Sequence, residues 1–238
     1  MQYFGGKVLV SKDLCNFINN EIKENQPFVD LFCGSCNIVS GIEPNRDRIA
    51  NDKHYYLIEM WKKVQSGWDI PTNITKEDYY SIKENGKDYE KGFYGFAYSF
   101  AGKWWGGWAK SEKQPKNYAE LSKNSTLRKI NNMKNVKFIN KDYYDVELPN
   151  NSFIYCDIPY KNSTPYCKKE VGDFDYDKFY NFVKEKSAEG HKVFVSEYLK
   201  NVPSGFDIVW TKNSKKIIRD SNDENADTVE VLFTYNCK

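Results

Sequence analysis

The sequence predicts an α/β protein whose core is a mostly parallel sheet of seven strands. Three observations support this prediction. Seven short apolar, β-branched or aromatic runs alternate along most of the chain with segments of helical spacing. A glycine turn at Gly34 follows the first run, and acids at Asp52 and Asp157 end two later runs. Open α/β sheets bind their ligands at the carboxyl ends of strands, so these positions predict one ligand site.

The composition is that of a soluble globular protein. Of 238 residues, 40% are hydrophobic and 29% charged, which excludes a disordered chain. No apolar run approaches 18 residues, and the first residues lack the apolar core of a signal peptide, so we expect a cytoplasmic protein without a membrane partner. The six cysteines are scattered, which predicts reduced thiols.

The first two strands lie in the N-terminal quarter of the chain. Helical spacing in residues 14–22 precedes a strand at residues 27–32. The glycine turn follows, and we expect a helix from about Asn37. A second strand at residues 48–51 ends at Asp52, and residues 54–64 have helical spacing.

Residues 67–133 interrupt the alternation of strands and helices. This stretch is rich in aromatic residues, glycine and lysine, with helical patches at residues 74–83, 93–100 and 119–133. We therefore predict an inserted subdomain over residues 67–133. Residues 1–66 and 134–238 would form the surrounding catalytic domain.

The remaining five strands follow the insertion. They are predicted at residues 136–139, 153–157, 192–196, 206–210 and 229–235. Phe179, Phe182 and Val183 indicate a helix between two of them. A polar segment without helical spacing separates the last two strands, which predicts an antiparallel hairpin and an antiparallel last strand.

The glycine turn after the first strand predicts a nucleoside site. It lacks both the GxGxxG of dinucleotide-binding proteins and the GK[ST] of a P-loop, so a pyrophosphate or triphosphate ligand is disfavoured. A nucleoside without phosphates fits better, with Asp30 near an ammonium group and Asp52 on the ribose hydroxyls. S-adenosylmethionine is such a ligand.

Cys33 and Cys36 form a CxxC pair, which also occurs in redox and zinc sites. The chain has no second CxxC pair, and its only histidines are His54 and His191. We therefore interpret both cysteines as small loop residues and expect no metal.

The segment Asp157-Ile158-Pro159-Tyr160 ends the fourth strand. Proline biases the residue before it toward an extended backbone, which can leave the Ile158 carbonyl facing a cleft. A carboxylate, a carbonyl and an aromatic ring within four residues suit a flat ring that carries an exocyclic amine. The alternative is an aspartate that only caps a loop.

A basic, tryptophan-rich block follows the middle of the insertion. Ten Lys or Arg residues lie between Lys103 and Lys141 against two acids, which favours a polyanion partner. Lys103, Trp104, Trp105 and Lys110 are the candidate DNA contacts, with tryptophans stacking on bases and lysines meeting phosphates. Two alternatives remain open: a solvated helix surface for the charges, and a hydrophobic root of a loop for the tryptophans.

The motifs resemble, in their order, those of the Dam-type DNA adenine N6-methyltransferases, in particular phage and orphan members. The matching segments are Phe4-Gly5-Gly6-Lys7, Asp30-Leu-Phe-Cys-Gly-Ser35, Asn51-Asp52, Lys141-Asp142-Tyr143 and Asp157-Ile-Pro-Tyr160. The similarity extends downstream to Tyr160-Lys-Asn-Ser-Thr164, Phe174-Asp-Tyr-Asp-Lys-Phe179, Val195-Ser-Glu-Tyr198 and Val229-Glu-Val-Leu-Phe-Thr-Tyr235. The resemblance implies a Rossmann-like methyltransferase fold and S-adenosylmethionine as cofactor. It also implies double-stranded DNA as partner, in a bacterial or phage-infected cell.

The resemblance also assigns roles to matching residues. Asp157, Ile158, Pro159 and Tyr160 would be catalytic. The cofactor would contact Tyr3, Phe4, Gly5, Lys7, Asp30, Phe32, Cys33, Gly34, Ser35, Asp52, Asp142 and Tyr143. Ile158 departs from the family motif, which usually has proline there, but the group required is a backbone carbonyl that isoleucine also supplies.

The resemblance implies methyl transfer to N6 of an adenine flipped out of the duplex. Two acceptors, the Asp157 carboxylate and the Ile158 carbonyl, would hold the amino group and direct its lone pair. Three alternatives stay open at this level: cytosine N4 methylation, a DNA-binding relative that turns over weakly or not at all, and methylation of RNA or a small molecule. The recognition sequence and any restriction-enzyme partner are not predicted.

Overall fold

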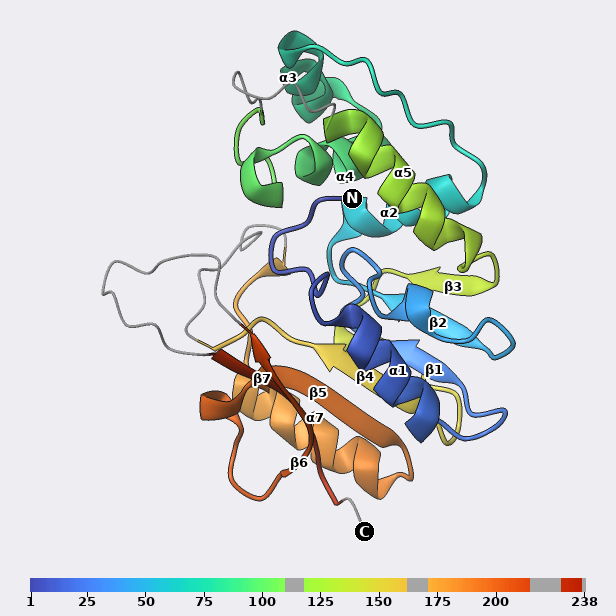
Figure 1. Ribbon diagram of the computed structural model, residues 1–238, viewed down its shortest axis with the longest axis vertical. Helices are drawn as coiled ribbons and strands as arrows, with labels where there is room; N and C mark the ends of the chain where they lie inside the picture. The colour runs from blue at the N-terminus through green and yellow to red at the C-terminus, as the bar shows by residue number, and fades with distance from the viewer. Residues whose placement is uncertain (110–117, 162–170, 215–227, 237–238) are drawn as a thin grey trace.

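The computed structural model describes residues 1–109, 118–161, 171–214 and 228–236. Its centre is a seven-stranded sheet in the order β3-β2-β1-β4-β5-β7-β6 (Figure 1). The strands are β1 (Phe28–Asp30), β2 (Arg48–Asn51), β3 (Val136–Ile139), β4 (Phe153–Asp157), β5 (Lys192–Tyr198), β6 (Asp207–Ser214) and β7 (Thr228–Thr234). All seven predicted strands are therefore present.

The five strands from β3 to β5 in this order are parallel, and β7 runs antiparallel to both of its neighbours, β5 and β6. Every residue of β1 and β2 is buried, as expected for parallel strands covered on both faces. The structure confirms the predicted fold class and the predicted hairpin. It also shows that the last strand inserts between two earlier ones.

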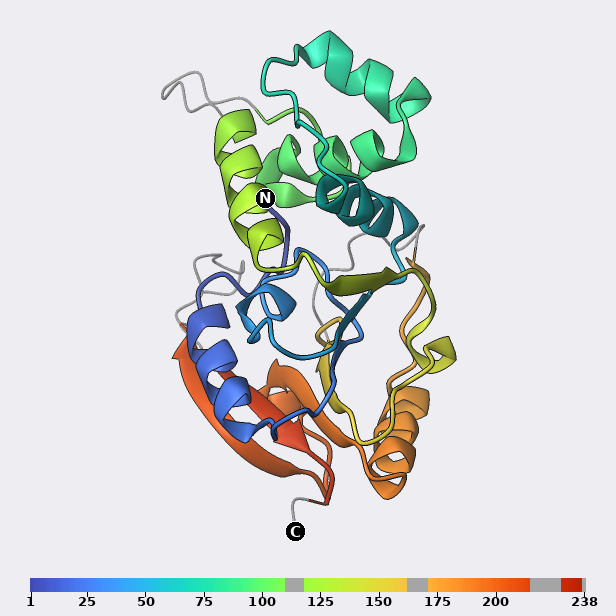
Figure 2. The ribbon, with the colours of Figure 1, turned by 90° about the vertical axis from the view of Figure 1, so that its right-hand side faces the viewer.

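Helices cover both faces of the sheet and form a second group beside it. They are α1 (Ser11–Glu21), α2 (Tyr55–Gln65), α3 (Lys76–Asn85), α4 (Asp88–Ala97), α5 (Tyr118–Asn131) and α7 (Tyr176–Ala188). Figure 2 shows α1, in blue, on one face of the sheet and α7, in orange, on the other. The helices α2 to α5 gather beyond the edge of the sheet (Figure 1).

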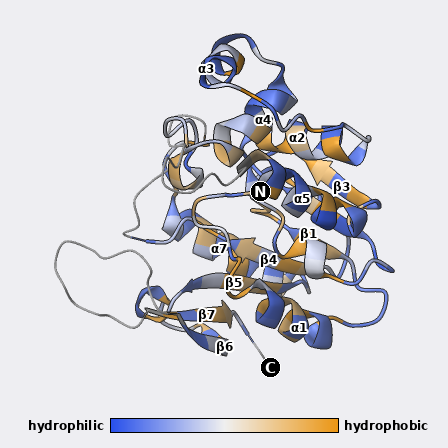
Figure 3. Cartoon of the chain, turned by 45° about the horizontal axis from the view of Figure 1, so that its top comes forward, coloured by the Kyte–Doolittle hydropathy of each residue, from blue (hydrophilic) through white to orange (hydrophobic). Residues whose placement is uncertain are grey.

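Alternate residues of the strands feed two buried apolar clusters. Phe28 and Tyr155 point into the cluster that contains α1, whereas Val29 and Ile154 point into the cluster that contains α7. This alternation follows from the two-residue repeat of a strand. In Figure 3 the central strands are largely coloured hydrophobic, while α1 carries many hydrophilic residues.

The predicted insertion is helical, as expected, and contains α3, α4 and α5. Helix α4 packs so closely on α2 that a side-chain carbon at Gly92 would lie 1.9 Å from the Tyr56 carbonyl oxygen. The apolar cluster beneath α1 continues through α2 into α3 and α4. The division into a catalytic domain and an inserted subdomain stays a prediction.

The helix expected from Asn37 does not form. Residues 34–38 make turns, and only a short 3-10 helix follows at Val39–Gly41. Backbone carbonyls of this segment accept hydrogen bonds from side chains outside it. Ile42 O accepts from the Arg48 guanidinium at 2.9 Å, and Ser40 O accepts from the Asn132 side-chain amide. With Pro44 close behind, too few residues remain for a stable helix.

Another predicted helix ends early. The patch expected at residues 93–100 belongs to α4, which stops at Ala97, and Ala101 takes a left-handed φ of 55° in the following turn. Within the described ranges, no helix has both the length and the apolar character needed to cross a membrane.

Candidate active site

A cavity of about 690 Å³ opens at the carboxyl ends of β1, β2 and β4. From β1 the strands β2 and β3 follow outward on one side of the sheet, whereas β4 and β5 follow on the other side. The strand order therefore reverses between β1 and β4. Ligands of open α/β sheets bind in the crevice at this point. Asp30, Asp52 and Asp157, which end or follow these three strands, all line the cavity.

The glycine turn forms one end of the cavity. Gly34 has a φ of +46°, and a side-chain carbon there would lie 3.1 Å from the ring of Tyr3. Its backbone N–H donates to Asp52 Oδ2 at 2.9 Å, while the N–H of His54 donates to Asp52 Oδ1 at 2.8 Å. Burial raises the pKa of Asp52. The turn and the Asp52 carboxylate are thus fixed to each other.

Asp30 is buried to 1% exposure at the end of β1. Burial raises the pKa of its carboxyl well above the usual value, and the nearby charge of Asp157 raises it further. The Phe32 N–H lies 3.4 Å from Asp30 Oδ1, a weak hydrogen bond. A cationic ligand in the cavity would compensate a carboxylate placed in this way.

An aromatic wall closes the side of the cavity beside the turn. The ring of Phe32 lies 5.6 Å from that of Tyr143 and 5.9 Å from that of Phe174. Asp142 precedes Tyr143 and accepts from Lys53 at 2.7 Å. A flat ring could lie against this wall, with the Asp142 carboxylate at its edge.

The opposite end of the cavity carries a charged cluster around Asp157. Lys7 Nζ lies 2.6 Å from Asp157 Oδ1 and 3.2 Å from Glu230 Oε1. The hydroxyl of Tyr160 donates to the same Glu230 oxygen at 2.9 Å. Lys7 Nζ also lies 4.2 Å from the centre of the Tyr160 ring. We call these four residues the Asp157 cluster.

The surroundings of Asp157 set its protonation. Burial raises its pKa from 3.8 to about 6, and the charges of Glu230 and Glu197 also raise it, whereas the ammonium of Lys7 lowers it. At neutral pH the carboxyl is therefore mostly ionised. It can accept hydrogen bonds and stabilise a positive charge that develops beside it.

Most predicted site residues meet in this one cavity. Those that line it are Tyr3, Gly5, Lys7, Asp30, Phe32, Cys33, Gly34, Ser35, Asp52, Asp142, Tyr143, Asp157, Pro159 and Tyr160. Phe4 does not line it and lies instead under the ammonium of Lys103, 4.9 Å from the ring centre. Ile158 is buried at 2% in the cluster beneath α7, so its side chain faces away from the cavity.

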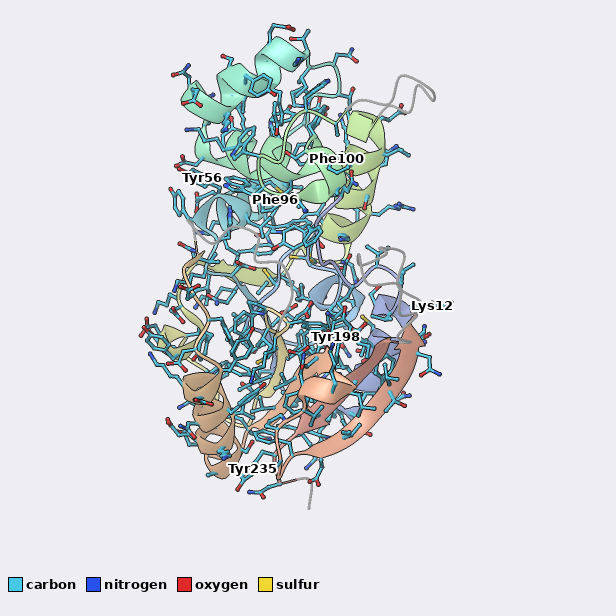
Figure 4. All side chains as sticks on the ribbon, turned by 90° about the vertical axis from the view of Figure 1, so that its left-hand side faces the viewer. Lys12, Tyr56, Phe96, Phe100, Tyr198 and Tyr235 are labelled. Atoms are coloured by element: carbon cyan, nitrogen blue, oxygen red, sulfur yellow. The ribbon has the colours of Figure 1, made fainter. Side chains whose placement is uncertain are left out.

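The tryptophans of the basic block pack against the helical group. Trp104 contacts His54 at 4.4 Å and Phe96 at 4.8 Å between ring centres. Trp105 contacts Tyr79 at 4.9 Å. Figure 4 shows Tyr56 and Phe96 close together in this group. This packing favours the alternative interpretation of both tryptophans as the hydrophobic root of a loop. Lys110 lies outside the described residues.

The two cysteines of the CxxC pair are inert. Cys33 and Cys36 are buried, and burial raises the pKa of both thiols, whereas a redox-active cysteine needs a lowered pKa. Across the described parts of the chain, no group of three or more His, Cys, Asp or Glu side chains is placed to hold a metal ion.

Several residues of the site escape the sequence prediction. Glu230 comes from β7, Phe174 from the segment before α7, and Tyr176 from the first position of α7. Asn51 ties the ends of β1 and β3 together through its side-chain amide. Asn51 and Phe174 lie inside motifs that the resemblance covers but without an assigned role. Glu230 also lies inside such a segment, Val229–Tyr235, and has no assigned role, because a single acid in a strand is most often a solvent-facing residue.

The strand order, with its antiparallel seventh strand, and the cavity at the switch point agree with the Rossmann-like methyltransferase fold that the sequence predicts. The sequence profile of the D12 class N6 adenine-specific DNA methyltransferases matches residues 3–117, almost half of the chain. This match confirms the resemblance found in the sequence. The matched part contains the glycine turn and Asp52 but ends before Asp157.

Two solved structures overlay on the chain with low scores. The tRNA (m1A58) methyltransferase TrmI from Aquifex aeolicus shares 13% identity, with a TM-score of 0.40 over 97% of this chain and 70% of its own. The protein SMU.472 in complex with SAH shares 12% identity, with a TM-score of 0.37 over 97% of this chain and 54% of its own. Among curated proteins, no sequence matches significantly.

Proposed function

We propose that this protein transfers a methyl group from S-adenosylmethionine to N6 of an adenine flipped out of double-stranded DNA. The observation that carries the proposal is the shared cavity. The Asp30 and Asp52 carboxylates lie at one end, the Asp157 cluster lies at the other, and about 690 Å³ connects them. This volume falls within the range of about 300–1,000 Å³ that small-molecule sites occupy.

The residues at the Asp30 end fit the cofactor. The glycine turn leaves room beside the Tyr3 ring that a side chain at Gly34 would fill. Asp30 would face the positive end of the cofactor, Asp52 the ribose hydroxyls, and Phe32 with Tyr143 its flat base. When bound, the cofactor supplies an activated methyl group.

The residues at the other end fit an exocyclic amine. Asp157 would accept a hydrogen bond from N6 and stabilise the positive charge that develops there during transfer. The Ile158 carbonyl would accept the second N–H. Fixing both N–H groups orients the nitrogen lone pair, and orientation of this kind lowers a barrier by up to about 7–11 kcal/mol.

The position of Asp157 supports base flipping as part of the proposal. Its carboxylate is at the end of β4, with a side-chain exposure of 20%, so a base stacked in a duplex does not reach it. Extruding the base costs a few kcal/mol. Stacking on an aromatic ring offsets roughly 1–3 kcal/mol. Tyr160 lines the cavity and supplies an aromatic ring beside Asp157 for such stacking.

The test is product analysis. Purified protein is incubated with duplex DNA and S-adenosylmethionine carrying a labelled methyl group, and the DNA is digested to nucleosides. We expect the label in N6-methyladenine and its absence with Asp157→Ala. Glu185→Ala, an exposed acid on α7, serves as the matched control that retains activity. Label in N4-methylcytosine, or DNA binding without any label, would overturn the proposal.

A further inference from the structure

The Asp157 cluster holds more charge than a methyl transfer to adenine requires. Lys7 is 7% exposed and bridges two carboxylates, one from β4 and one from β7. The methyl acceptor needs only the first of them. Glu230 is itself 7% exposed and does not line the cavity, so it acts on the substrate only through other residues.

We propose that Glu230 is a positioning residue for the base-binding end of the cavity. It shares the ammonium of Lys7 with Asp157, so that the charge of Asp157 is not fully neutralised, and it fixes the Tyr160 ring through its hydroxyl. This inference rests on the proposed function, because it assigns Asp157 and Tyr160 to the target base.

The charge count of the cluster supports this role. A lone Lys7–Asp157 pair would be neutral, and a neutral pair stabilises a developing positive charge poorly. Adding Glu230 gives one cation and two anions, which leaves a net negative charge facing the cavity. A carboxylate has about four acceptor positions, so Asp157 can bind Lys7 and an amino group together.

The geometry at Tyr160 supports the second part of the role. The Tyr160 hydroxyl and the Lys7 ammonium both reach Glu230 Oε1, at 2.9 and 3.2 Å. The Tyr198 ring packs against Tyr160 in a T-shaped contact, at 4.6 Å between ring centres. In Figure 4, Tyr198 lies between the helical group with Phe96 and the far end of the sheet near Tyr235. The Tyr160 ring is therefore held by a hydrogen bond at its hydroxyl, by Lys7 over one face and by the Tyr198 ring.

Other charged groups near Asp157 also affect the pKa of its carboxyl. Glu197 on β5 is fully buried and accepts from the backbone N–H groups of Lys161 and Tyr198. Asp30 on β1 faces Asp157 across the cavity. These two acids are unchanged in the variants below, so each variant reports on the residue that it alters.

The experiment measures the pH dependence of kcat/KM for DNA in two variants of opposite charge effect. Glu230→Gln keeps an oxygen that can accept hydrogen bonds from Tyr160 and Lys7 but removes the negative charge, which lowers the pKa of Asp157. The acidic limb of the profile, where kcat/KM falls as the pH decreases, therefore moves to lower pH. Lys7→Met removes the cation, so the limb moves to higher pH, by about one unit or more. We expect kcat to fall at least tenfold in both.

Matched controls separate these effects from a general change of charge. Glu185→Gln and Lys184→Met, both exposed on α7, carry the same charge changes and should leave the limb in place. Tyr160→Phe removes the hydroxyl bond to Glu230 without changing charge, so kcat falls while the limb stays. Shifts in the same direction for Glu230→Gln and Lys7→Met, or no shift in either, would overturn the inference.

A second measurement covers variants that lose activity. The Asp157 carboxyl carbon is titrated by NMR in the protein without substrate, where the same opposite shifts are expected. If the unaltered protein transfers no methyl group, the proposed function fails. The NMR titration still decides whether Glu230 and Lys7 set the charge of Asp157.

Discussion

Opposing effects act on the pKa of the Asp157 carboxyl. Burial and two neighbouring acids raise its pKa, while Lys7 at 2.6 Å lowers it. The outcome, a pKa of about 6, keeps the carboxylate charged at neutral pH but close to protonation. Groups with such shifted values are common where acids take part in chemistry.

The pH dependence of the reaction follows from this value. A raised pKa means that Asp157 becomes protonated, and loses its negative charge, as pH falls through about 6. We expect kcat/KM to be nearly constant from pH 7 to 8 and to fall about tenfold per unit below pH 6, because this parameter reports on the free enzyme. A profile that stays flat down to pH 4.5 would contradict the assignment of Asp157.

Substitution of Tyr160 tests the stacking role. Tyr160→Ala removes the ring that would receive the base, a loss of roughly 1–3 kcal/mol, which corresponds to a fall of about 5- to 150-fold in kcat/KM. Tyr160→Trp, which keeps an aromatic face, should recover part of the loss. Steady-state kinetics with a short duplex give both values. Equal activity in Tyr160→Ala and the unaltered protein would exclude stacking on this ring.

At the scale of single residues, the sequence predicts the functional residues that belong to short motifs. Asp30, Asp52, Asp157 and Tyr160 meet in one cavity because each follows a strand, and strand ends are visible in the apolar pattern. Glu230 and Phe174 escape prediction because their roles depend on which strand or loop lies beside them. The sequence prediction for Ile158 concerns only its backbone carbonyl. The side chain is buried and contributes to packing.

Helix α4 contacts α2 at Gly92, and this contact sets the distance between the two helices. A side-chain carbon at Gly92 would lie 1.9 Å from a backbone oxygen of α2, which cannot move independently of its helix. We expect Gly92→Ala to destabilise the protein by about 1–3 kcal/mol, the usual cost of overpacking. Thermal unfolding measures this loss.

The control for Gly92→Ala is Lys83→Ala on α3, an exposed helical position where alanine fits. Its midpoint should stay within about one degree of that of the unaltered protein, because exposed helical substitutions change stability little. A Gly92→Ala protein that is as stable as the unaltered protein would show that α4 does not rest on α2 in solution.

Prediction at the scale of elements succeeds where periodicity is strong. The seven strands, the helix at residues 54–64 and the helix indicated by Phe179, Phe182 and Val183 follow from spacing alone. The segment after Gly34 is the exception, because Arg48 and Asn132 bond its carbonyls from outside, and distant partners leave no trace in a local pattern. The position of β7 between β5 and β6 is likewise a property of the assembled sheet.

The whole molecule combines a cavity with a basic stretch of the insertion, and the DNA is expected to contact both. Lys103 lies over Phe4, next to Tyr3 at the cavity wall. If it meets a phosphate, Lys103→Ala should weaken binding to all duplexes alike. It should also reduce the slope of log K against log salt by about one.

Lys184→Ala, on the part of α7 that lies away from the cavity, is the matched control and should keep the slope of the unaltered protein. Titrations of a fluorescent duplex at several salt concentrations give these slopes. A slope that Lys103→Ala leaves unchanged would place this lysine among the solvated surface charges.

The insertion of β7 between β5 and β6 has a consequence for biosynthesis. Until β7 is in place, β6 lacks its partner in the described sheet, and the edge of β5 that faces away from β4 is left without hydrogen-bond partners. The strand that fills the gap also delivers Glu230. A chain cut before β7 should therefore expose this edge, which favours aggregation, and it would lack the acid that shares Lys7 with Asp157.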